Sequence, residues 1–306
     1  MMKNVLKSIA TACVIAVSVQ AFTIGVVASN LPPAVGSPAV RAERVLDLPE
    51  AKSVKLTNTD GFVRVRTRSV PEIRVEATIK AYARSSADEL ATEAYVASLI
   101  RVDTEDETLS IVTEPEERPD ALDLYVDYVV LVPKGTAVTV DGANGNVWIS
   151  KGCGAVTVQG RNTDIEIVEP GGPVAATSIN GRIRVIDAPD DATLRTVNGN
   201  VYAHMLGGML RASTTNGSIV ARVLDPAVTT CDVTSQNGGI TLLMEDGCSA
   251  SLEAVTARGR ITSAFLVDTS SGVQKRRCLR GIIGDGKIKL NLDTLNGNIR
   301  IAKNRV

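Results

Sequence analysis

Aliphatic residues recur at every eighteenth position along the second half of the chain. One column of these residues consists of Val147, Ile165, Ile183, Val201 and Ile219. A second column follows two positions later, and another pair of columns begins half a period away at Val156 and Val158. Alternate residues of a strand point to the same side of a sheet. Each unit therefore predicts two short strands with apolar inner faces.

Asparagine marks the turn between the two strands with the same period. It occupies five positions, each the eighteenth after the one before: Asn144, Asn162, Asn180, Asn198 and Asn216. Glycine follows four of them, and Thr163 replaces it once. Glycine accepts a positive backbone φ and asparagine tolerates one, so we expect these pairs to form bends. If the units stack, the asparagine amides are expected to form a hydrogen-bonded ladder.

Units of this kind predict an all-β fold, a right-handed parallel β-solenoid with two short strands per coil. One unit cannot bury its apolar side alone, but stacking at about 4.8 Å creates a continuous narrow core. The right-handed sense is the one expected for parallel crossover connections. The coil lengthens after Asn216, because Asn237 is the twenty-first residue after it and Arg258 is the twenty-first after Asn237. Asn296 closes the series.

The chain before residue 141 repeats less regularly. The stretch Asn58–Val63 is similar to an early copy of the unit. Between Ser86 and Ile100, a capping serine, an acid three positions later and apolar residues at helical spacing predict a helix. An open end rung is an edge for aggregation, so we expect this helix to cover the N-terminal end of the solenoid.

Residues 1–29 have the pattern of an export segment. Lys3 and Lys7 precede a run over 8–29 that is apolar apart from small hydroxyl residues and Gln20. That run is also long enough, at roughly 20 residues, to cross a bilayer. A cleaved signal peptide and a retained membrane anchor both fit, and either predicts an extracytoplasmic protein of the periplasm or cell surface. Four segments are predicted: the export segment at 1–29, a linker at 30–44, N-terminal strands with the capping helix at 45–140, and regular repeats at 141–306.

Charge narrows the expected partners. The formal net charge is −1, and one short basic run, Lys275–Arg277, lies close to Arg280. Phosphate binding by a nucleic-acid partner needs a basic stripe, so nucleic acid is not expected. We interpret the run as a solvated loop. Membrane contact is expected only through residues 8–29, if they are retained.

Little in the chain suggests catalysis. His204 is the single histidine, so neither a Ser-His-Asp triad nor a histidine metal cluster can be assembled. We predict no enzymatic activity, no metal and no cofactor. Outside the export segment, the cysteines are Cys153, Cys231, Cys248 and Cys278. Four cysteines in an exported chain allow two disulfides with three connectivities, and packed free thiols are the alternative.

One outward column of side chains is the candidate binding strip: Trp148, Glu166, Arg184 and Tyr202. Its two rings are separated by three rungs, or about 14 Å. Arg182 is the eighteenth residue after Asp164, as Arg184 is after Glu166, so we expect salt bridges between neighbouring strands. A carboxylate paired with arginine has a lowered pKa and is a poor general acid, which disfavours a catalytic dyad.

The Asn-Gly-x-Ile/Val units and the closing stretches Gly281–Leu290 and Thr294–Ile301 resemble a bacterial family. This is the adhesin family of β-strand repeat proteins, catalogued as a domain of unknown function, and the resemblance spans roughly 45–301. It implies a β-solenoid outside the cytoplasm without established catalytic residues. We therefore expect a non-catalytic envelope module that binds an envelope protein or a cell-wall glycan. A carbohydrate-active enzyme using Asp164 and Glu166, and a self-assembling scaffold or stress-sensing component, are the alternatives.

Overall fold

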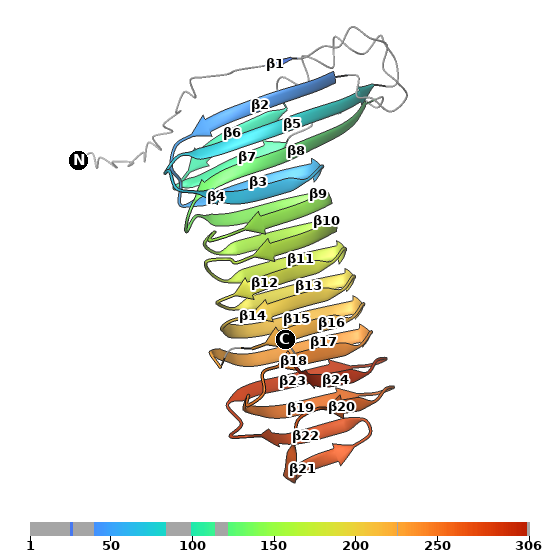
Figure 1. Ribbon diagram of the computed structural model, residues 1–306. Coiled ribbons are helices and arrows are strands. Elements are labelled where there is room, and N and C mark those ends of the chain that lie inside the picture. The colour runs from blue at the N-terminus through green and yellow to red at the C-terminus, as the bar shows by residue number, and fades with distance from the viewer. Residues whose placement is uncertain (1–24, 27–39, 84–98, 114–121, 225, 305–306) are drawn as a thin grey trace, which may run out of the picture.

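The computed structural model describes residues 25–26, 40–83, 99–113, 122–224 and 226–304, and their regular elements are all strands. The fold is all-β. The strands form an elongated stack that runs from β2 at one end to β21 at the other (Figure 1). No helix in the described part of the chain has the length and hydropathy needed to cross a bilayer.

The N-terminal strands build one end of the stack. They are β1 (Gly25–Val26), β2 (Val40–Leu48), β3 (Ser53–Asp60), β4 (Val63–Arg68), β5 (Ile73–Ala83), β6 (Ile100–Glu105), β7 (Thr108–Thr113) and β8 (Leu122–Pro133). β5 pairs antiparallel with both β2 and β8, whereas β3 and β4 pair parallel with β9. Because Asp60 lies beside Asn144 and Val63 beside Val147, β3 and β4 form the first unit of the stack.

The middle of the stack consists of β9 (Ala137–Ser150), β10 (Val156–Val168), β11 (Val174–Asn180), β12 (Ile183–Ala188), β13 (Ala192–Asn198), β14 (Val201–Met205), β15 (Gly208–Asn216), β16 (Ile219–Val223), β17 (Val228–Asn237) and β18 (Ile240–Met244). We call two consecutive strand segments joined at the asparagine turn a rung. The first halves form one parallel ladder and the second halves another, while β9 and β10 run through both.

Residues of one column lie side by side in these ladders. Ile165 pairs with Ile183 and Ile183 with Val201, the same register of 18 residues that joins Asn162 to Asn180. After β15 the register lengthens to the 21 residues that separate Asn216 from Asn237. The inward columns from both ladders join one hydrophobic core. Apolar side chains at alternate positions of every rung therefore bury each other across and along the stack.

At the C-terminal end, chain order and spatial order differ. The strands there are β19 (Ala250–Thr256), β20 (Ile261–Ser263), β21 (Asp268–Lys275), β22 (Cys278–Ile283), β23 (Ile288–Thr294) and β24 (Ile299–Lys303). β23 pairs with β17 on one side and β19 on the other, and β24 lies between β18 and β20. The expected order, with Arg258 directly after Asn237, is wrong because a strand edge accepts any segment with the right alternation of apolar residues.

The predicted helix and the predicted N-terminal segments can be compared with the structure only at their ends, because most of their residues lie outside the described part of the chain. The predicted helix over 86–100 lies outside the described residues except for Leu99 and Ile100, and Ile100 begins strand β6. Its expected C-terminal end is therefore wrong. Strand β2 begins at Val40, inside the predicted linker 30–44, and most of the export segment lies outside the described residues.

Glycine follows asparagine in most of the turns for a different reason than expected. Gly145 has a positive φ, but Gly181, Gly199 and Gly217 do not. Instead, a Cβ atom on Gly199 would lie 2.0 Å from the carbonyl oxygen of Gly181. The turns of neighbouring rungs touch backbone to backbone, so close approach rather than bend geometry excludes a side chain.

Candidate functional site

The four residues of the candidate strip lie next to one another on the outer face of the second ladder. Trp148 on β9 pairs with Glu166 on β10, Glu166 with Arg184 on β12, and Arg184 with Tyr202 on β14. They line a hollow of about 250 Å³ whose other polar side chains are Asn146, Asp164, Arg182 and Asn200. The stack thus places two aromatic residues at the ends of a groove and charged pairs between them.

The Trp148 end of the groove is held by two residues outside the predicted strip. Arg64 on β4 is the ladder neighbour of Trp148, and its guanidinium lies 5.2 Å from the centre of the indole ring. The ring of Phe62 meets Trp148 edge-on at 5.9 Å. Both contacts favour one orientation of the indole. Aligning Asp60–Gly61 with Asn144–Gly145 would have revealed Arg64, since it then falls in the Trp148 column.

The centre of the groove contains the expected ion pairs. Arg182 lies 2.9 Å from Asp164 through its guanidinium and also donates its backbone N–H to that carboxylate at 2.7 Å. Arg184 is 3.7 Å from Glu166. Partial burial favours the neutral form of Asp164, but the hydrogen bonds and charge of Arg182 outweigh it, so the pKa of Asp164 is below its ordinary value. Asp164 is therefore an acceptor of hydrogen bonds and not a proton donor.

The Tyr202 end is fixed by two arginines. The guanidinium of Arg184 lies 5.0 Å from the centre of the Tyr202 ring, and Arg222 donates to the Tyr202 hydroxyl at 3.3 Å. Beyond Tyr202, the His204 Nδ1 is 2.5 Å from an oxygen of Asp187. Within the described residues no cluster of His, Cys, Asp and Glu is arranged to hold a metal ion. The single histidine is a partner of Asp187, and neither residue lines the groove.

These positions suit a ligand with alternating apolar and hydroxylated surfaces. Aromatic rings offer flat apolar faces, while the paired charges and the amides of Asn146 and Asn200 offer donors and acceptors along the same line. The groove follows the stacking direction, so it repeats similar contacts at about 4.8 Å intervals. A chain-like molecule laid along the stack would meet several rungs at once.

The asparagine ladder runs beside this groove. Asn162 donates to Asn144 at 2.6 Å, and the same amide-to-amide bond continues through Asn180, Asn198 and Asn216. Asn144 itself donates to Asp60, and Asn237 and Asn296 extend the series at the other end. Each amide uses one donor toward the preceding rung and its oxygen toward the next. The ladder fixes the register of the turns that border the groove.

A second polar ladder lies inside the turns and was not anticipated. Thr196 donates its hydroxyl to the Gly181 carbonyl at 3.0 Å, and Thr214 does the same to Gly199 at 2.9 Å. The signal was present in the sequence as a serine or threonine two positions before each asparagine of the ladder from Asn180 onward.

One rung reverses this arrangement. It has Gly160 in the hydroxyl column and Thr163 in the glycine column. A Cβ on Gly160 would lie 2.4 Å from the Thr163 Cβ, so one side chain fills the space of the other. The missing glycine at Thr163 is therefore compensated within its own turn.

The four cysteines in the described part of the chain are free thiols. Cys153 and Cys231 are buried, and Cys248 and Cys278 are partly buried. Burial raises the pKa of Cys153 to about 11 and that of Cys231 to about 12. Protonated buried thiols are poor nucleophiles, so these two residues pack as small apolar side chains.

No protein-family model and no curated protein matches this chain. A "putative adhesin" from Bacteroides fragilis is 11% identical with a TM-score of 0.45, covering 86% of this chain and 97% of its own. A "putative lipid binding protein" from Parabacteroides distasonis is 11% identical with a TM-score of 0.41, covering 88% and 98%. A "putative adhesin" from Parabacteroides merdae is 8% identical with a TM-score of 0.37, covering 88% and 97%.

Proposed function

We propose that this chain is a non-catalytic binding module of the cell envelope, a right-handed β-solenoid whose outer groove binds a cell-wall glycan. Residues 1–29 would direct it out of the cytoplasm, as a cleaved signal or a retained anchor, and 141–306 would be its regular repeat region. The observation that carries the proposal is the groove itself. Trp148, Glu166, Arg184 and Tyr202 stand in register on four neighbouring strand segments and line one hollow.

Sugar rings match this arrangement in chemistry and in shape. Each ring has an apolar C–H face that can pack on an aromatic side chain and hydroxyl groups at its edge that can bind charged and amide groups. The ion pairs need not break for binding, because each carboxylate and guanidinium has further lone pairs or N–H groups. A polysaccharide extended along the stack would use both aromatic ends, which explains why neither end needs to be a deep pocket.

Intrinsic fluorescence tests the proposal because Trp148 is the single tryptophan. Full-length protein is titrated with soluble peptidoglycan fragments and with neutral and acidic polysaccharides. We expect a saturable change in Trp148 emission, and a Tyr202→Ala variant that binds about 10-fold more weakly through loss of one aromatic contact. Tyr125→Ala is the matched control, since Tyr125 is 46% exposed and contacts Tyr82 away from the groove.

Each of three results would contradict the proposal and favour another interpretation. Binding that Tyr202→Ala and Trp148→Ala leave unchanged, measured by titration calorimetry, would move the site elsewhere. Release of reducing ends from a polysaccharide, stopped by Asp164→Asn, would make the chain a carbohydrate-active enzyme. Light scattering that rises with protein concentration in the absence of glycan, with no saturable fluorescence change, would favour a self-assembling scaffold.

A further inference from the structure

The C-terminal end of the stack is basic. Residues 253–289 contain eight lysines and arginines and three aspartates and glutamates, a difference of +5, whereas the whole chain has a net charge of −1. All eight cations are exposed. One of them, Arg280, pairs with Glu253 at 2.7 Å. We call this region, residues 253–289 with Arg300, the basic tip.

Three arginines of the basic tip surround one hollow. Arg260, Arg276 and Arg300 line a space of about 470 Å³ together with Thr262 and Asn298. All three arginine side chains are exposed, and among the residues that the structure describes none of the three forms an ion pair. Guanidinium groups without a carboxylate partner bind phosphate and other oxyanions well, because their N–H groups match two oxygens at a time.

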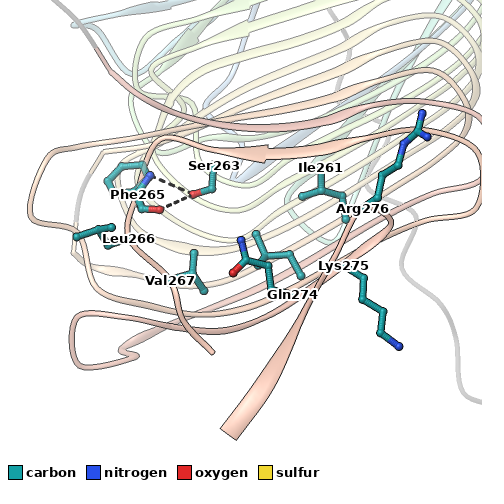
Figure 2. A pocket seen from close by; sticks show the side chains of 9 residues that line it. Ile261, Ser263, Phe265, Leu266, Val267, Gln274, Lys275 and Arg276 are labelled. Atoms are coloured by element: carbon teal, nitrogen blue, oxygen red, sulfur yellow. Dashed lines mark hydrogen bonds between the residues drawn. The ribbon is translucent and has the colours of Figure 1, made fainter. Parts of the chain in front are cut away.

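A second hollow of about 570 Å³, lined by both apolar and polar residues, adjoins the arginines, and Arg276 lines both spaces. Figure 2 shows Ile261, Val267 and Gln274 around its centre, Leu266 at one end and Lys275 and Arg276 at the other. Leu266 is 96% exposed, far more than any other large apolar residue that the structure describes. Leu266 projects into water from a loop that also contains the partly exposed apolar residues Phe265 and Val267. A contiguous exposed apolar segment is typical of an interaction site.

The hollow follows from the topology of the tip. The first ladder continues beyond β19 with β22, which pairs antiparallel with β19, and then with β21, which pairs antiparallel with β22. The second ladder ends at β20, a strand of three residues that pairs only with β24 among the described strands. The inner face of the β21–β22 hairpin therefore lacks a facing strand. Its apolar residue Leu279 and the loop around Leu266 border an open end of the core.

We propose that the basic tip docks on an anionic phospholipid surface. The arginine trio would bind headgroup phosphates while Leu266 and its apolar neighbours enter the acyl boundary. Clustered cations next to an exposed apolar loop are the combination that stable peripheral attachment needs, because neither charge nor a small apolar insertion is sufficient alone. The proposal changes two expectations, that Lys275–Arg277 is a solvated loop and that only residues 8–29 contact a membrane.

A tryptophan at the tip tests the contact where it occurs, independently of the N-terminal segment. Leu266→Trp is introduced into a full-length chain with Trp148→Phe, so that the emission comes from the tip alone. Vesicles of phosphatidylglycerol and phosphatidylcholine are expected to shift this emission to the blue, and brominated acyl chains to quench it. The same probe at Leu206, which is 38% exposed on the middle of the stack, is the matched control and should not respond.

The arginine trio is tested in the same background. Replacing Arg260, Arg276 and Arg300 by glutamine should weaken vesicle binding about 100-fold, because each cation near an anionic surface contributes to the free energy of binding. The corresponding lysine variant keeps the charge and should recover most of the affinity, which separates charge loss from misfolding. Circular dichroism verifies that both variants retain the strand signal.

Several outcomes would overturn the proposal. An equal shift with pure phosphatidylcholine would mean apolar insertion without recognition of an anionic lipid. A response to millimolar inorganic phosphate without vesicle binding would leave only a site for free anions. Binding to polyglutamate but not to vesicles would point to an acidic protein partner, and silence toward all probes would leave the tip without a ligand of this kind. None of these results bears on glycan binding at Trp148.

Discussion

Between β9 and β17, each rung stacks on the rung that precedes it in the chain, whereas the last rungs do not follow chain order. In the middle, Asn180, Asn198 and Asn216 follow one another at 18 residues in the same ladder. At the C-terminal end, the neighbour of Asn237 is Asn296, which is 59 residues away. The two regions use the same unit and the same contacts. The repeat length predicts which rungs are neighbours in the middle of the stack, but it does not predict this at the C-terminal end.

The difference shows what a repeat can specify. A short connection forces the next unit onto the nearest free edge, so sequence spacing and spatial neighbourhood agree. A longer excursion through β19–β22 releases that constraint. Ile261 is the twenty-first residue after Ile240, as Ile240 is after Ile219, yet Ile240 pairs with Ile299. The chain fills the edge of β17–β18 with its C-terminal strands.

The largest effect is expected from removal of β23 and β24, the rung inserted between β17–β18 and β19–β20. A chain that ends at residue 286 lacks the buried residues of β23 and β24: Ile288, Leu290, Leu292, Ile299 and Ile301. Burial of such side chains contributes about 2 kcal/mol each, and the total approaches the whole stability of an ordinary domain. We expect loss of cooperative thermal unfolding and rapid proteolysis after Met244. Removal of only 305–306 is the control and should leave the melting temperature unchanged.

A truncated chain that melts like the full-length protein would contradict this prediction. It would mean that β19–β20 stacks directly on β17–β18 once the edge is free. The 21-residue register between Asn216 and Asn237 would then continue to Arg258. The pairing of β23 and β24 with β17 and β18 would be only slightly more stable than the pairing of β19 and β20 with the same edge.

The next test targets the close contact between turns in the regular region. Gly199→Ala would place a Cβ 2.0 Å from the Gly181 carbonyl oxygen, so the rungs must separate. We expect the free energy of unfolding to fall by about 3 kcal/mol, measured by urea denaturation. Gly142→Ala is the control, because the nearest atom is the Asn58 carbonyl oxygen at 3.8 Å. A change of less than about 0.5 kcal/mol is expected there.

A smaller effect concerns the buried thiol at the border between the two regions. Burial raises the pKa of Cys231 to about 12, so the folded state keeps the thiol proton that the unfolded state loses above about pH 9. This contribution to stability is present below pH 9 and is lost as the pH rises toward 12. Between pH 8 and pH 10 the free energy of unfolding should fall by about 1 kcal/mol through this group.

Cys231→Ala should remove this part of the pH dependence and leave the part that comes from Cys153, whose pKa burial also raises, to about 11. Val233→Ala on the same strand is the control, because it creates a comparable cavity without a titrating group and should keep the slope. Equal slopes in both variants would show that Cys231 is not the source of the alkaline sensitivity.

The smallest effect compares the asparagine ladder in the two regions. Asn198 donates to Asn180 and accepts from Asn216, so Asn198→Ala should cost about 1 kcal/mol. Asn296 donates to Asn237 and, among the described residues, has no further amide of the ladder beyond it, so Asn296→Ala should cost about half as much. Urea denaturation of the two variants measures the difference. A larger loss at Asn296 would mean that the inserted rung depends on its turn more than the regular rungs do.

Within the regular region, much could be predicted from the sequence alone. The constant spacing of the repeat determined which residues share a column, and hence that Trp148, Glu166, Arg184 and Tyr202 stand in register. It also anticipated the asparagine ladder and the Asp164–Arg182 pair. These features depend only on a fixed register between neighbouring rungs, which a repeat encodes directly.

Only the tertiary structure decided the contacts that cross long stretches of chain. It placed Arg64 against Trp148, inserted β23 between β17 and β19, and brought Arg300 beside Arg260 and Arg276. The physical reason is the same in each case. A strand edge offers the same backbone groups to every segment of suitable pattern, so the connections and the packing of the whole stack select the partner. The repeat length of this chain determines a rung and its regular neighbours, and the ends of the stack depend on which segments reach the free edges.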